Sequence, residues 1–203
     1  ACLEGLLHGE SQNGIQCIAL FDNEEVGSRT RQGAASTFLI DTLRRITQAM
    51  ALTEEDLQRA LASSLMISAD NAHAVHPNVP EKSDPTNRVY LNQGIVIKYN
   101  ANQSYTSDAI SAALFKELCA EVGVKTQYFT NRSDLKGGGT LGSISTSQVS
   151  IASVDIGLAQ LAMHSCNETA GVEDSEAMIL AIQRFYSTHR SMPQEGVLIQ
   201  QAD

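Results

Sequence analysis

An acidic cluster follows directly on an apolar segment near the start of the chain. Residues 15–21 are almost all apolar, and Asp22-Asn23-Glu24-Glu25 comes next. Adjacent carboxylates repel one another unless a cation or a proton separates them. In such a pair, one Glu can bind a metal while its neighbour takes a proton from the metal's water. A solvent-exposed acidic loop is the alternative interpretation of this cluster taken alone.

Two further groups of metal-ligand residues also follow apolar segments. Asp70, His73 and His76 come after residues 65–67, and His164 comes shortly after residues 149–156. Nitrogen and oxygen donors of this kind suit zinc, and less selectively manganese or cobalt. Each group alone is compatible with an ordinary polar loop. Their repeated position after apolar segments favours one shared site.

A lysine, a tyrosine and a glycine-rich segment complete the set of candidates. Lys98 follows residues 95–97, Tyr105 lies seven positions later, and Gly139 and Thr140 belong to the glycine-rich segment 137–142. A lysine beside the site can bind an acidic group of a substrate, although a single lysine is also typical of a solvated surface. The glycines allow backbone to approach a ligand closely, or form a tight structural turn. The segment lacks the Lys-Ser/Thr of a phosphate-binding loop, and the chain has no Gly-x-Ser-x-Gly motif, so nucleotide binding and serine hydrolysis are disfavoured.

The elements that must position these residues alternate between strands and helices. Apolar runs predict strands at 15–21, 65–67, 95–97, 125–129 and 149–156. Apolar spacing and capping residues predict helices at 34–50, after Thr53, after Ser107-Asp108 and at 173–188, while 76–92 reads as a long loop. This order predicts an α/β fold with a mostly parallel sheet flanked by helices on both faces. Because ligands bind beyond the carboxyl ends of such strands, the polar groups are expected to meet there.

Composition limits the classes of partner. The 203 residues are 42% hydrophobic, which predicts a single domain over residues 1–203. A formal net charge of -9 weighs against nucleic-acid partners and anionic membranes, and no apolar run is long enough to span a membrane. The four cysteines, Cys2, Cys17, Cys119 and Cys166, lack a CxxC spacing. They predict reduced thiols in a cytoplasmic protein, with a disulfide framework or a thiolate zinc site as the alternatives.

In order along the chain, several motifs resemble the aspartyl aminopeptidase family, whose members are dinuclear zinc exopeptidases. The matching segments are Phe21-Asp22-Asn23-Glu24-Glu25-Val26-Gly27-Ser28, Ser68-Ala69-Asp70-Asn71-Ala72-His73-Ala74, Val96-Ile97-Lys98, Arg132-Ser133-Asp134, Gly138-Gly139-Thr140-Leu141-Gly142, Val154-Asp155-Ile156-Gly157 and Met163-His164-Ser165. Several such motifs in sequence are far more specific than any one of them.

The resemblance implies roles for individual residues in a zinc-exopeptidase fold. Glu24 would be the general base, Glu25 and His164 would bind one zinc, and Asp70 would bind the other; manganese or cobalt could replace zinc. The substrate pocket would be lined by His73, Lys98, Tyr105, Gly139 and Thr140. Lys98 would pair with the acidic side chain of a peptide that begins with Asp or Glu.

The resemblance also implies that this is the C-terminal catalytic part of a longer protein. The family's earlier His-x-Asp motif, its metal-bridging Asp and its inserted dimerisation domain have no counterpart in the sequence. The full-length form is expected to be a homo-oligomer, and the isolated chain to bind metal poorly and to have little activity. The alternatives are a noncatalytic module that retains the scaffold for assembly or peptide binding, and a related zinc peptidase with another specificity.

Overall fold

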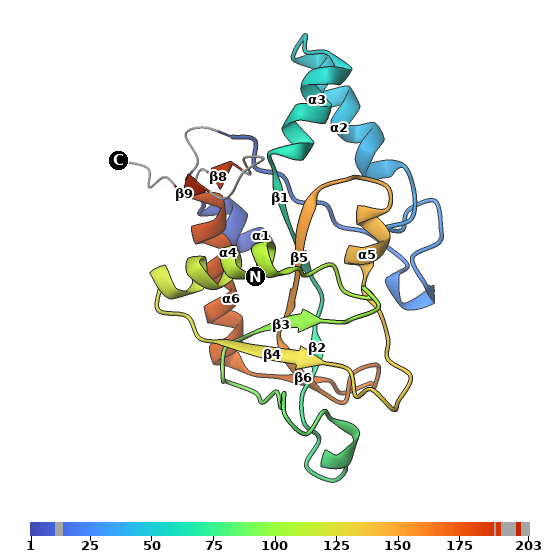
Figure 1. Ribbon diagram of the computed structural model, residues 1–203, viewed down its shortest axis with the longest axis vertical. Helices are drawn as coiled ribbons and strands as arrows, with labels where there is room; N and C mark the ends of the chain where they lie inside the picture. The colour runs from blue at the N-terminus through green and yellow to red at the C-terminus, as the bar shows by residue number, and fades with distance from the viewer. Residues whose placement is uncertain (11–13, 189, 192–197, 200–203) are drawn as a thin grey trace.

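The core of the molecule is a four-stranded sheet with helices on both faces (Figure 1). The computed structural model describes residues 1–10, 14–188, 190–191 and 198–199. The strands lie in the order β1 (Leu65–Ala69), β5 (Ala152–Gly157), β3 (Ile95–Tyr99) and β4 (Thr126–Thr130). The β1–β5 and β3–β4 pairs are parallel, and β5 runs antiparallel to β3. The predicted α/β fold with a mostly parallel sheet is therefore confirmed.

One face of the sheet is apolar and carries the main core. Helices α4 (Ala109–Glu121) and α6 (Val172–Tyr186) pack against it, and α1 (Cys2–Leu7) packs on α6. Alternation along the strands turns every second residue towards these helices. The buried cluster comprises Ile95, Ile97, Ala112, Phe115, Leu118, Cys119, Val154, Ile156, Met178, Ala181 and Ile182. Packing of this face against the helices holds the sheet in place, and the polar candidate residues lie on and beyond that sheet.

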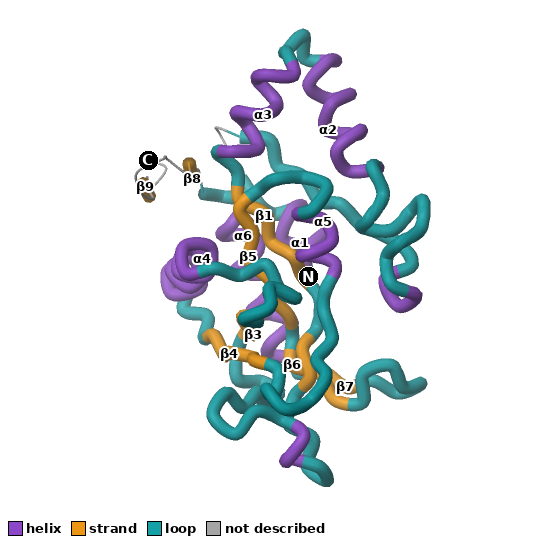
Figure 2. Tube along the Cα trace, turned by 45° about the vertical axis from the view of Figure 1, so that its right-hand side comes forward, coloured by secondary structure: helices purple, strands orange, loops and turns teal. Residues whose placement is uncertain are grey.

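The opposite face of the sheet is partly polar although it is buried. Ser68, Lys98 and Asp155 alternate there with the apolar residues of the first face, and all three are buried. The short helix α5 (Leu141–Thr146) packs on β1 and β5. A second small sheet of β2 (Ala72–His73), β6 (Ala159–Leu161) and β7 (Thr169–Ala170) continues from the ends of β1 and β5 (Figure 2).

A helical hairpin projects from one end of the sheet, at the top of Figures 1 and 2. It consists of α2 (Phe38–Ala49) and α3 (Glu54–Ala62), whose buried residues pack on Val149. Thr53 caps α3: its hydroxyl accepts from the Asp56 backbone N–H, and the Asp56 carboxylate accepts from the Thr53 backbone N–H. Both helices were predicted, but α2 begins four residues later than expected because residues 34–37 form turns.

The predicted strand at 15–21 is wrong. Residues 15–21 make no strand, and Ile15 and Leu20 are 68% and 73% exposed. A strand requires a neighbouring strand to receive its backbone hydrogen bonds, and no described residue supplies one here. The segment is held instead by Tyr186, whose hydroxyl donates to the Cys17 carbonyl and whose carbonyl accepts from the Gln16 amide.

The other predicted strands and helices are present with shifted ends, and one further helix was not predicted. The glycine-rich loop gives way to α5 at Leu141, a short helix that was not expected, and β5 begins at Ala152 rather than at residue 149. Residues 76–92 form the expected long loop, interrupted by one 3-10 turn at Pro80–Lys82. The last pair of strands is β8 (Arg190–Ser191) and β9 (Leu198–Ile199). All four cysteines are free, as expected, and within the described ranges no helix is long and apolar enough to cross a membrane.

Candidate active site

The acidic cluster forms a tight turn whose backbone is unusual. Glu24–Val26 is a single 3-10 turn between Asn23 (φ 59°) and Gly27 (φ 98°), both in the left-handed region. The Asn23 amide donates to the Thr30 hydroxyl, and the Ser28 backbone N–H donates to the Asn23 carbonyl at 2.9 Å. A left-handed residue other than glycine is costly and persists where its surroundings impose it. These bonds within residues 23–30 hold the backbone of Glu24 and Glu25 in a defined conformation.

His164 reaches the second of these carboxylates. Its Nε2 atom lies 3.0 Å from Oε2 of Glu25, and both side chains are exposed. His164 also has a left-handed backbone (φ 68°), and its backbone N–H donates to Glu168 at 2.6 Å. An imidazole nitrogen and a carboxylate oxygen are donors of the kind that zinc binds. The chemistry of this pair therefore suits a zinc ion, and the charges of Glu24 and Asp70 act on the same region.

Glu24 lies in a field that favours its protonated form. Partial burial raises the pKa of Glu24, and the charges of Asp70 and Glu25 raise it further, while His164 and Lys98 oppose them. The charges of four other candidate residues thus act on the Glu24 carboxylate. A carboxylate with raised proton affinity is suited to general-base catalysis.

Lys98 is a buried lysine that contacts Asp70. Its side chain is only 2% exposed, and Nζ donates to Asp70 Oδ2 at 3.5 Å and to the Asn71 carbonyl at 2.8 Å. Burial lowers the pKa of Lys98, and Asp70 and Asp155 counteract this. Nζ also lies 5.5 Å from the centre of the Tyr105 ring. Lys98, Asp70 and Tyr105 thus form one group.

His73 and the glycine-rich loop border this group. Partial desolvation lowers the pKa of His73, and the charges of His164 and Lys98 lower it further, which favours a neutral imidazole. The Thr140 backbone N–H donates to the Ser104 carbonyl at 3.3 Å, just before Tyr105. Gly139 also lies beside this carbonyl, since a Cβ on Gly139 would come within 3.4 Å of it.

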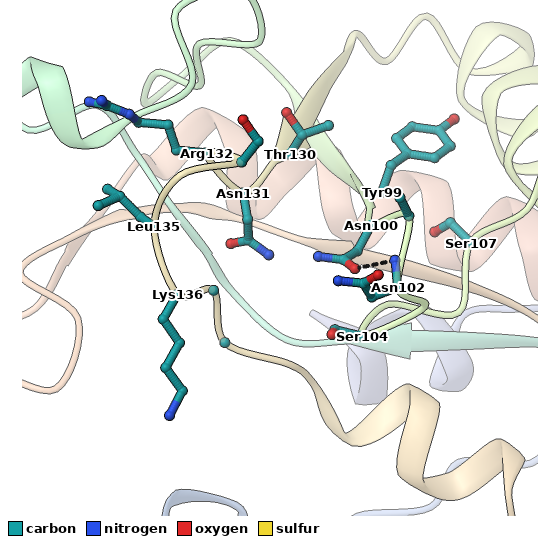
Figure 3. A pocket seen from close by; sticks show the side chains of 14 residues that line it. Tyr99, Asn100, Asn102, Ser104, Ser107, Thr130, Asn131, Arg132, Leu135 and Lys136 are labelled. Atoms are coloured by element: carbon teal, nitrogen blue, oxygen red, sulfur yellow. Dashed lines mark hydrogen bonds between the residues drawn. The ribbon is translucent and has the colours of Figure 1, made fainter.

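A cavity of about 740 Å³ opens beyond the carboxyl ends of β3 and β4 (Figure 3). The amide side chains of Asn100, Asn102 and Asn131 point towards one another across it, and Lys136 belongs to its lining. The Asn131 amide donates to the Tyr105 hydroxyl at 3.3 Å, so the cavity adjoins the Lys98 group. The amide groups in its lining give donors and acceptors suited to the backbone of a peptide.

The structure brings the predicted residues near one another but does not assemble a complete metal site from them. Glu25 meets His164, whereas the closest charged partner of Asp70 is Lys98. Across the described part of the chain, no three or more His, Cys, Asp or Glu side chains are grouped so as to hold a metal ion. His76, also a candidate ligand from the sequence, instead accepts a hydrogen bond at its Nδ1 atom from the Asn78 backbone N–H.

Two residues of this region were not singled out from the sequence. Asp155 is fully buried and accepts hydrogen bonds from Thr106 and Thr140. Asn71 supplies the carbonyl that binds Lys98. The signal for Asp155 was its place inside the apolar strand sequence Val154-Asp155-Ile156, where a charged residue needs a structural or functional reason. Asn71 gave no comparable signal because the bond uses its backbone.

Comparison with known proteins identifies a family. Residues 1–186 match the family model described as "Aminopeptidase I zinc metalloprotease (M18)". A protein of Clostridium novyi named "Probable M18 family aminopeptidase 2" is 49% identical over 187 residues, which cover 92% of this chain and 43% of that protein. A "Probable aspartyl aminopeptidase" of Ricinus communis is 41% identical over 167 residues, covering 82% of this chain and 34% of that protein. The chain therefore spans less than half the length of these relatives.

Solved structures share the fold. The M18 aminopeptidase of Thermotoga maritima superimposes with a TM-score of 0.83 at 27% identity, over 92% of this chain and 43% of that one. The Saccharomyces cerevisiae mApe1 dodecamer gives a TM-score of 0.71 at 34% identity, over 82% of this chain and 36% of that one.

Proposed function

Because the chain belongs to the M18 family of zinc metalloproteases, we propose that it is the catalytic part of an aminopeptidase that removes acidic residues from the N-termini of peptides. The observation that carries the proposal is the contact of His164 with Glu25, with Glu24 beside it and the buried cation of Lys98 close by. In this proposal residues 1–203 form a single domain, the C-terminal part of a longer protein.

The residues that would hold zinc are Glu25 and His164 for one ion and Asp70 for a second, with manganese or cobalt as possible replacements. The exposed contact of Glu25 with His164 supports the first site. Asp70 keeps one third of its side chain exposed, which leaves its carboxylate accessible. When bound, such ions supply an activated water and stabilise negative charge on the peptide carbonyl oxygen. The segments expected to complete the ligand set would come from outside this chain.

Glu24 is the proposed proton carrier. Its carboxylate takes the proton of the water that attacks the peptide carbonyl and then gives this proton to the departing amine. The raised pKa of Glu24 supports this role, because the group must both accept and release a proton. The rigid turn Glu24–Val26 keeps the carboxylate in place during the two transfers.

Lys98 is the proposed determinant of specificity. An ammonium group has three donors, and Asp70 and Asn71 take two of them within the described part of the chain. The third would bind the carboxylate of an N-terminal Asp or Glu side chain. Neutral His73, Tyr105, Gly139 and Thr140 would border the peptide. The name of the Ricinus communis relative supports the acidic specificity.

The proposed setting is a cytoplasmic homo-oligomer. The dodecameric relative supports assembly of the full-length protein into many copies. The net charge of -9 supports peptides, rather than nucleic acids or anionic membranes, as its partners.

We expect the complete protein to release Asp from a peptide at least roughly tenfold faster than it releases Ala from the matched peptide. Activity should vanish after treatment with a chelator and return when zinc is added. The 203-residue chain alone should turn over poorly. Free amino acids released from both peptides are the measurement. If the complete protein with zinc cleaves neither peptide, a noncatalytic module replaces this proposal; equal cleavage of both would show a related peptidase of another specificity.

A further inference from the structure

We propose that Asp155 is a positioning residue, which holds the glycine-rich loop and the loop after β3 in the places where they border the proposed substrate pocket next to Lys98. The inference rests on the proposed function for the substrate that fills this pocket. Asp155 itself lies beneath the pocket and acts through Thr106 and Thr140.

Both carboxylate oxygens of Asp155 are engaged by these two loops. Oδ2 accepts from the Thr106 backbone N–H at 2.6 Å and from the Thr106 hydroxyl at 3.1 Å. Oδ1 accepts from the Thr140 hydroxyl at 2.9 Å. The backbone of Asp155 is held as well, because its N–H donates to the Ser107 hydroxyl at 2.9 Å. One side chain therefore joins two loops that are far apart in the sequence.

Asp155 is a buried carboxylate whose direct partners are hydrogen-bond donors, with the charge of Lys98 further away. Its side chain is 0% exposed, and among the described residues no cation lies within ion-pair distance of it. A buried carboxylate is costly unless donors compensate it. Thr106 and Thr140 supply these donors, and the arrangement is stable only while both loops stay in place. The charge is thus linked to the loop positions.

Asp155 and Lys98 are neighbours on adjacent strands and lie on the same face of the sheet. Ser68 is paired with Asp155 in the β1–β5 register. In the β5–β3 register Ile156 is paired with Ile97, so the next positions along, Asp155 and Lys98, share a face. The pocket cation and the residue that anchors the loops are therefore neighbours on one rigid sheet.

Gly142, in the first turn of α5, lies close to the Asp155 carboxylate. A Cβ on Gly142 would lie 2.7 Å from Asp155 Oδ1 and 2.5 Å from the Ser68 hydroxyl. Only glycine allows this approach without a shift. Gly142 follows Thr140 by two residues, so the hydrogen bond and the close contact fix the end of the glycine-rich loop together.

Two proposed pocket residues depend on these contacts. Tyr105 directly precedes Thr106, and Gly139 directly precedes Thr140. The Thr140 backbone N–H also donates to the Ser104 carbonyl, which joins the two loops directly. A loss of Asp155 should thus displace the Tyr105 and Gly139 sides of the pocket while leaving Glu24, on its separate turn, in place.

The test is the variant Asp155→Asn, compared with Ser153→Ala as a matched control. Asn keeps the size of the side chain but has one acceptor oxygen where Asp has two. Ser153 is buried on the same face of β5 and contacts the same Thr106 hydroxyl at 3.1 Å, but not Thr140. In the complete protein, Asp155→Asn should raise KM for the acidic peptide by roughly tenfold or more and change kcat less than about threefold. Ser153→Ala should leave both values unchanged.

Hydrogen exchange on the 203-residue chain gives a readout that does not need activity. In Asp155→Asn and in Thr140→Val, backbone exchange should become faster in residues 137–140 and stay unchanged in α6. At residues 137–140 the double variant should be no worse than the more affected of the two single variants, because both changes act on the same contact between Thr140 and the side chain at position 155. Exchange that is unchanged at 137–140 would overturn the proposal, as would a loss confined to kcat. A complete protein without any peptidase activity would contradict the proposed function, while the exchange comparison would still decide whether Asp155 positions the loops.

Discussion

Replacing Glu24 with Gln should lower kcat of the complete protein by roughly 10²- to 10⁴-fold and leave KM within about threefold. Gln has nearly the size of Glu and keeps one acceptor oxygen, but it cannot take a proton from water. Burial and the charges of Asp70 and Glu25 raise the pKa of Glu24, which is the direction a general base requires. The effect should therefore fall on the chemical step rather than on binding.

A matched control for this variant is Asp22→Asn. Asp22 is an exposed carboxylate two residues earlier, and its side chain accepts from the Asn23 backbone N–H at 2.8 Å, which Asn can also do. Steady-state kinetics should give wild-type values for Asp22→Asn. If Glu24→Gln retained more than about one tenth of the wild-type kcat, the base would have to be another group.

Replacing Lys98 with Met should remove the preference for acidic peptides. We expect kcat/KM for a peptide with N-terminal Asp to fall roughly a hundredfold, and kcat/KM for the matched peptide with N-terminal Ala to change much less. Met fills a similar volume in a site that is only 2% exposed, so the core should remain packed. The charge is lost, and with it the partner of an acidic side chain.

Lys116→Met is the control for the loss of a lysine. Lys116 Nζ lies 5.5 Å from the centre of the Tyr128 ring, the same distance that separates Lys98 from Tyr105. Lys116 lies on α4, and the apolar core packs between that helix and the sheet face opposite Lys98. Its replacement should not alter the ratio of the two kcat/KM values. Equal losses on both peptides in Lys98→Met would mean that Lys98 supports Asp70 structurally and does not select the substrate.

The helices and strands that were predicted correctly have local sequence patterns of their own. Strand β3 is an apolar run, α3 has a complete capping box at Thr53 and Asp56, and α6 has regular apolar spacing. These features act over a few residues and do not depend on the rest of the fold. The alternation of such elements was sufficient for the α/β class.

The failures concern features that depend on distant residues. The run 15–21 has the composition of a buried strand, but a strand forms only beside a partner, and a local pattern cannot show whether the partner is present. The role of Asp155 depends in the same way on Thr106 and Thr140, which approach it from other loops. The contact between Glu25 and His164 was anticipated only through the order of the family's motifs, since their separation in the chain contains no local signal.

If Glu25 and His164 hold zinc as proposed, the affinity of the chain for zinc depends on the His164 imidazole. Competition with a chromophoric chelator would compare the wild type with His164→Ala and His8→Ala. His8 is an ideal control because its Nε2 atom lies 3.0 Å from Glu4 and both side chains are exposed, as in the His164 pair. We expect weak zinc binding by the wild type, a further loss of affinity of roughly tenfold or more in His164→Ala, and no change in His8→Ala. Wild-type affinity in His164→Ala would contradict the proposed zinc site.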